Sequence, residues 1–80
     1  MSWNYRIVRQ FVADGLTTVP QPWFGIHEAY YDKQGQCTNI TVDPVPIVGD
    51  TVEELNGVRT MMFAATKLPV LDYETRAEVK

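Results

Sequence analysis

Residues 23–42, WFGIHEAYYDKQGQCTNITV, contain two strand-forming runs separated by a turn, and this stretch decides the fold. The runs 23–31 and 37–42 are rich in aromatic and β-branched residues, which favour β-strands. Between them, Asp32 and Gly35 are the first and fourth residues of DKQG, which suits a type I turn closed by a left-handed glycine. The stretch therefore predicts an antiparallel β-hairpin.

The flanking segments add a strand before the hairpin and a helix after it. Residues 3–12 form a third strand-like run, and the prolines and glycine of 13–22 predict a loop. Three signals predict a helix over 51–67. Thr51 and Glu54 have the spacing of a capping box, and Pro69 ends the helix. Between them runs an apolar stripe of Leu55, Val58, Met62 and Ala65. The expected fold is α+β: a three-stranded antiparallel meander (β-β-β-α), covered on one face by a single C-terminal helix. Residues 1–80 are expected to form one small domain.

The turn also predicts which side chains share a face of the sheet. With Asp32 opposite Gln36, three cross-strand pairs share the face expected under the helix: Tyr30 with Thr38, Glu28 with Ile40, and Ile26 with Val42. The opposite face is expected to be open and to bind a partner, because Trp and Tyr are favoured interface anchors; its candidate residues are Trp23, His27, Ala29, Tyr31 and Cys37. An alternative is that the 13–22 loop or the C-terminal tail covers this face.

The sequence lacks the residues that nucleophilic or metal-dependent catalysis needs. His27 is the only histidine and Cys37 the only cysteine. His27 and Glu28 are neighbours on a strand, so their side chains point to opposite sides of the sheet. Cys37 is two residue pairs from His27, about 13 Å at the rise of a strand. The glycines are spaced singly, which fits no phosphate-binding loop. We therefore expect no enzyme activity, no catalytic residue, no metal site and no cofactor.

Charge and hydropathy narrow the class of partner. The net charge is −3 and the seven lysines and arginines are scattered, whereas nucleic-acid binding favours a basic surface. A nucleic-acid-binding module stays an alternative, because aromatic side chains on an open sheet can stack bases. The N-terminus has no apolar signal-peptide core, and no apolar run approaches the roughly 20 residues of a membrane helix. We expect a cytoplasmic protein that does not bind membranes. Its expected role is protein–protein interaction, with a protein partner or by self-association, through the open face or an edge strand.

Three stretches resemble a known group of proteins: MSWNYRIVR at 1–9, GIHEAYYD at 25–32 and LPVLDYE at 68–74. The group consists of small bacterial and phage proteins without a known activity, which begin with W-N-Y-R, carry an I-H-E-x-Y-Y-D strand and end near P-V-L-D. The resemblance implies a compact small domain. In size and composition the chain is also similar to phage-encoded inhibitors such as anti-CRISPR proteins, which makes an inhibitor of a host complex an alternative function.

Overall fold

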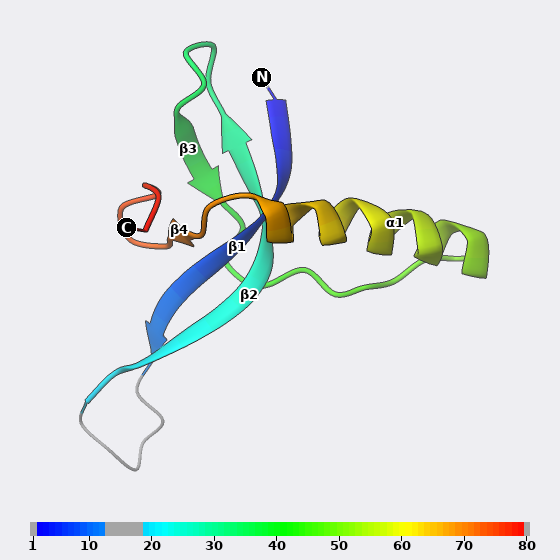
Figure 1. The fold of residues 1–80 in the computed structure, drawn as a ribbon, viewed down its shortest axis with the longest axis horizontal. Coiled ribbons are helices and arrows are strands. Elements are labelled where there is room, and N and C mark those ends of the chain that lie inside the picture. Colours follow the sequence, from blue (N-terminus) through cyan, green and yellow to red (C-terminus); the bar gives the residue numbers. More distant parts are fainter. Residues whose placement is uncertain (1, 13–18, 80) are drawn as a thin grey trace.

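The chain forms an α+β fold with a curled four-stranded sheet and one helix, in a computed structural model that describes residues 2–12 and 19–79 (Figure 1). The strands are β1 (Ser2–Val12), β2 (Gln21–Tyr31), β3 (Cys37–Ile40) and β4 (Leu71–Asp72); the helix α1 (Val52–Ala64) continues into the 3-10 turn η1 (Ala65–Lys67). The sheet order is β3-β2-β1-β4, and β4 runs parallel to β1. The predicted α+β class is confirmed and β1, β2 and β3 form an antiparallel meander, but the prediction of a three-stranded sheet is incomplete, because the C-terminal tail adds a fourth, parallel strand.

The pairing of β1 with β2 is the longest in the sheet and gives it two distinct faces. Ile7 lies opposite Ile26 at the middle of the paired strands. We call the side that carries Ile7 and Ile26 the outer face, and the side that carries Val8 and Ala29 the inner face. The buried residues of β1 and β2 all belong to the inner face; they are Arg6, Val8, His27 and Ala29.

The inner face is covered, which contradicts the expectation that His27 and Ala29 lie on an open surface. Leu71 is buried with Val8 and Ala29 in one core cluster, and Tyr73 packs against that cluster. The alternative in which the C-terminal tail covers this face is confirmed. The cause is the apolar tail, which pairs with β1 and brings Leu71 onto Val8. Residues 13–18 of the predicted loop lie outside the described residues.

The hairpin between β2 and β3 has the predicted turn but a different register. The N–H of Asp32 donates to the carbonyl of Gln36 at 2.9 Å, and Gly35 has a φ of 79°. Tyr31 then lies opposite Cys37, but Tyr30 lies opposite Asn39, so Thr38 is an extra residue that forms a β-bulge.

The bulge corrects the predicted cross-strand pairs. Ile40 lies opposite Ala29 instead of Glu28, and it packs against the inner-face core. A shift of one residue moves a side chain to the other face of a sheet, so the bulge moves Ile40 from the outer face to a half-buried position on the inner face. Val42, expected beside Ile26 under the helix, is 73% exposed. The predicted pairs of Tyr30 with Thr38, Glu28 with Ile40 and Ile26 with Val42 are therefore wrong.

The helix begins as predicted, but it covers little of the sheet. The Thr51 hydroxyl accepts a hydrogen bond from the N–H of Glu54 at 3.0 Å, which caps the helix. The predicted stripe faces inward: Met62 and Ala65 are buried, and Leu55 and Val58 are half-buried. The C-terminal end of α1 and the turn η1 contact β1, while the rest of the helix extends away from the sheet (Figure 1).

Met62 anchors the helix, so we expect Met62→Ala to destabilise the fold by about 2–4 kcal/mol through the cavity it leaves. Met62 is 2% exposed, whereas its neighbour Phe63 is 63% exposed. Phe63→Ala is the matched control and should change the free energy of unfolding by less than about 1 kcal/mol. Urea unfolding followed by circular dichroism measures both. Equal losses would show that α1 packs on a different side.

Gly25 allows a close approach between β2 and the segment after β3. A Cβ at Gly25 would lie 2.8 Å from Cγ of Pro44, a ring atom that cannot move aside, whereas nothing lies within 4 Å of a Cβ at Gly57. Gly25→Ala should therefore destabilise the fold by about 1–3 kcal/mol through overpacking. Gly57→Ala should stabilise α1 by about 0.5–1 kcal/mol. A thermal melt that shifts both variants in the same direction would contradict this account of Gly25.

Candidate functional site

The far end of the β1–β2 ribbon projects from the rest of the sheet (Figure 1). We call residues 10–12 and 21–24 the aromatic arm. In the described part of the chain, neither β3 nor β4 pairs with it. Its rings are at least half exposed: Phe11 54%, Trp23 50% and Phe24 54%. A two-stranded ribbon is marginally stable in water, and clustered exposed rings mark binding surfaces.

The register places these rings on both sides of the arm. Phe24 lies opposite Arg9 and Phe11 opposite Pro22, so both phenylalanines belong to the outer face. Trp23 lies opposite Gln10 and belongs to the inner face, beyond the part that the tail covers. An arm with apolar rings on both sides offers a surface to a partner from either side.

The opposite end of the outer face borders an apolar groove. Residues 3–5 of β1 line it together with four residues from the end of the helix and the segment that follows, which are Met61, Ala64, Ala65 and Leu68. The groove has a volume of about 280 Å³. The Trp3 and Tyr5 rings meet edge to face, with centroids 5.2 Å apart, which fixes one wall. We call this feature the helix groove.

Two charged residues lie on the outer face between the arm and the helix groove. They are Arg9 of β1 and Glu28 of β2, and on the same face Asp72 of β4 pairs with Arg9. The Tyr30 hydroxyl donates a hydrogen bond to Oε1 of Glu28 at 2.5 Å. This bond to the Glu28 carboxylate is the main cause that raises the pKa of Tyr30 above 10.0. The outer face is therefore mostly apolar, with one positive position, Arg9, and two negative positions, Glu28 and Asp72.

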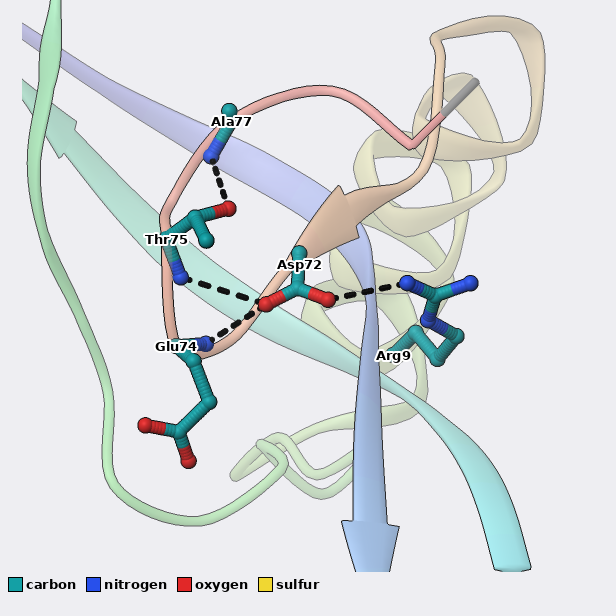
Figure 2. Close-up of polar contacts among 5 residues, drawn as sticks. All are labelled: Arg9, Asp72, Glu74, Thr75 and Ala77. Atoms are coloured by element: carbon teal, nitrogen blue, oxygen red, sulfur yellow. Dashed lines mark hydrogen bonds and ion pairs between the residues drawn. The ribbon is translucent and has the colours of Figure 1, made fainter.

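Arg9 connects the arm to the C-terminal tail (Figure 2). Its Nη2 donates to Oδ2 of Asp72 at 2.9 Å, and its guanidinium carbon lies 4.9 Å from the centroid of the Phe11 ring. Oδ1 of Asp72 accepts hydrogen bonds from the backbone N–H groups of Glu74 and Thr75. The bond from Arg9, followed by these backbone bonds, holds the pKa of Asp72 below its ordinary value of 3.8. Asp72 therefore positions Arg9 beneath the arm.

Of the five residues predicted to bind a partner, Trp23 is the one in the arm. His27 is fully buried, and its Nδ1 lies 2.9 Å from the carbonyl oxygen of Thr41. Its Nε2 is buried and has no hydrogen-bond partner within residues 2–12 and 19–79. Ala29 is fully buried in the core cluster. His27 and Ala29 are therefore not available to a partner.

Tyr31 and Cys37 lie near each other but far along β2 from the arm. They are half-buried and help to line a cavity of about 400 Å³ between the β2–β3 hairpin and the tail. The Tyr31 hydroxyl donates to Oδ1 of Asn4 at 2.7 Å and accepts from Nη1 of Arg6 at 2.9 Å. The two residues support the tail side of the fold, and the structure does not bring them together with Trp23.

The sequence reasoning missed Phe11 and Phe24, although a signal for them exists. The strand-like run of 23–31 is longer than its hairpin partner of 37–42. The end of β2 that lies away from the turn therefore extends beyond the end of β3. Residues 3–12 pair with that end of β2, but β3 does not reach it. The side chains there, including Phe11 and Phe24, therefore lie on a ribbon of two strands without a third.

The described residues also bear on catalysis, metal binding and membrane insertion. His27 lies opposite Arg6 and Glu28 lies opposite Tyr5, so the two side chains are on opposite faces, as predicted. Within residues 2–12 and 19–79, no three histidine, cysteine or acidic side chains gather as metal ligands. Across the same ranges, no helix has the length and apolar character needed to span a membrane.

The chain matches no protein-family model, no curated protein and no solved structure. The resemblance to small bacterial and phage proteins therefore stays a prediction. The arm, the helix groove and the contacts of Arg9 provide the basis for a functional proposal.

We expect Asp72→Asn to destabilise the fold by about 1–2 kcal/mol near neutral pH, because it removes the acceptor of a charge-assisted hydrogen bond. The folded-state pKa of Asp72 is lowered, so its contribution is fully present above the unfolded pKa and is lost as the pH falls through the folded pKa. The difference between wild type and Asp72→Asn should thus stay constant from about pH 7 to about pH 5 and shrink as the pH falls further. Urea unfolding at several pH values measures it.

Glu74→Gln is the control for this experiment, since Asp72 contacts the backbone of Glu74 and this variant keeps that bond. Its unfolding free energy should stay within about 0.5 kcal/mol of wild type. A gap between wild type and Asp72→Asn that persists undiminished in acid would contradict the role of the ionised carboxylate.

Proposed function

We propose that this chain is a non-enzymatic protein–protein interaction module that binds another protein through the aromatic arm. The observation that carries the proposal is the exposure of Phe11, Trp23 and Phe24 on a ribbon that projects beyond the sheet. Aromatic residues dominate the binding energy of protein interfaces when a partner removes them from water. The arm presents these rings on two paired strands, which fix their positions along the ribbon.

The charge of the arm favours a protein partner over a nucleic acid. Residues 10–12 and 21–24 contain no charged side chain, and the nearest cation, Arg9, is held by Asp72. Nucleic-acid affinity depends on cations that neutralise phosphates. The core of a protein interface is instead depleted in charge and enriched in aromatic residues.

Trp23→Ala should weaken the binding of a protein partner by about tenfold or more while leaving the fold intact. Trp23 is half exposed at the end of the ribbon, so its loss should shift the melting temperature by only a few degrees. The measurement is affinity capture from nuclease-treated lysate of the source organism, with wild type and Trp23→Ala as paired baits at equal density.

Val42→Ala is the matched control bait, because Val42 is 73% exposed and lies outside the arm. A protein captured by wild type and Val42→Ala, and lost with Trp23→Ala, supports the proposal. Equal capture by all three baits, or no specific capture by wild type, contradicts it. Circular dichroism of each bait shows that the variants are folded.

A further inference from the structure

We propose that the cavity between the β2–β3 hairpin and the C-terminal tail binds a small organic carboxylate, held by Arg6 and Arg76. The cavity has a volume of about 400 Å³, and both arginines line it together with Glu78. We call it the tail cavity. The inference goes beyond the proposed function, because no residue of the aromatic arm lines this cavity.

Arg6 is the first argument, because it is a buried cation whose donors are only partly used. It is 7% exposed. Of the five N–H groups of its guanidinium, one on Nη1 bonds to the Tyr31 hydroxyl at 2.9 Å and one on Nη2 bonds to the Pro69 carbonyl at 2.6 Å. Its Nε is buried and has no hydrogen-bond partner among residues 2–12 and 19–79. Both acceptors are neutral, so they leave the positive charge of Arg6 unbalanced.

The carboxylate nearest to Arg6 balances this charge only in part. Oε2 of Glu78 lies 3.9 Å from Nη2 of Arg6, which is beyond hydrogen-bond distance, and the Glu78 side chain is 58% exposed and therefore screened by solvent. Arg9 shows the contrast: its side chain is less buried than that of Arg6, yet it donates to Asp72 at 2.9 Å. Buried charges in proteins are almost always paired, so an additional anion would stabilise Arg6.

Arg76 brings a second positive charge to the same cavity from the tail. Its φ of 61° is uncommon for a residue other than glycine, and the turn that follows β4 holds this conformation. The N–H of Arg76 donates to the carbonyl of Asp72 at 2.7 Å, and the N–H of Asp72 donates to the carbonyl of Ala77 at 2.8 Å. Arg76 forms no ion pair with any residue that the structure describes. The turn therefore presents an unpaired cation to the cavity that Arg6 lines.

The lining of the tail cavity favours a carboxylate with a small apolar body. Its charged lining residues are Arg6, Arg76 and Glu78, which leave one positive charge. A carboxylate neutralises that charge, whereas a phosphate monoester carries up to two negative charges at neutral pH. A guanidinium also binds a carboxylate through two parallel hydrogen bonds. Leu71 and Ala77 supply an apolar wall, and the volume is within the range of small-molecule sites.

The test uses benzoate as the probe, because it joins one carboxylate to a small apolar ring. Benzamide, its neutral analogue, is the matched control ligand. In NMR titrations at constant ionic strength, benzoate should shift the Nε–H signal of Arg6 and saturate with a Kd below about 10 mM. Benzamide should bind at least about tenfold more weakly, since it has no charge. Absence of saturation, or equal binding of benzamide, overturns the proposal.

Two substitutions should change the affinity for benzoate in opposite directions. Arg76→Gln removes a cation and should weaken binding by about fivefold or more, whereas Glu78→Gln removes a competing carboxylate and should strengthen it by about threefold or more. Both side chains are exposed, so both variants should fold, which circular dichroism checks. Arg59→Gln changes the net charge as Arg76→Gln does, at an exposed position of α1 outside the cavity, and should leave the affinity unchanged. Weaker binding by Glu78→Gln, or equal effects of the two arginine variants, would refute the assigned site.

Cys37 gives an independent readout, because it is the only cysteine and it lines the tail cavity. Saturating benzoate should slow the reaction of its thiol with iodoacetamide by about threefold or more, because the bound ring restricts access to the sulfur. An unchanged rate would place the ligand elsewhere and overturn the proposal.

Inorganic phosphate tests the class of anion. It should bind more weakly than benzoate, and tighter binding of phosphate overturns the assignment of a carboxylate. Trp23→Ala should bind benzoate as wild type does, because Trp23 lies outside the cavity. Loss of partner capture through the arm and loss of benzoate binding are therefore separate results, and either proposal can fail without the other.

Discussion

The pairing of β1 with β2 is the interaction on which the rest of the structure depends. It places Val8 and Ala29 on the inner face, where residues of the tail and of β3 pack against them, and it leaves the outer face to aromatic side chains. Because side chains alternate along a strand, this one register decides both the core and the candidate binding surface. A shift of one residue would exchange the two, so the same pairing that stabilises the fold also fixes the arm.

Two arginines of β1 hold the tail in place from opposite faces. On the inner face, Nη2 of Arg6 donates to the carbonyl of Pro69 at 2.6 Å. On the outer face, Arg9 donates to Asp72. A guanidinium removed from water stays favourable only when hydrogen bonds replace its hydration, and the tail supplies those acceptors. The short strand β4 thus depends on side-chain anchors as much as on its own ladder, since it pairs with β1 at Val8 and Arg9 alone in the described residues.

Features set by nearby residues could be predicted from the sequence, and features set by distant packing could not. The cap at Thr51 and the turn closed by Gly35 each depend on a few neighbouring residues, and both are as expected. The bulge at Thr38 depends on where Ile40 can be buried, and that place exists only once the tail has added Leu71 to the core. A strand of two residues leaves no periodic pattern to read. For the same reason Trp23 could be proposed as a binding residue, while His27 and Ala29 were assigned to a surface that the tail in fact covers.

The position of Arg9 links the stability of the tail to the proposed interface. Arg9 accounts for one hydrogen bond of Asp72 and lies close to the Phe11 ring. Protonation of Asp72 in acid would release the side chain that orders the root of the arm. Partner binding through the arm and tail docking would then weaken over the same pH range, because both depend on one guanidinium held in one orientation.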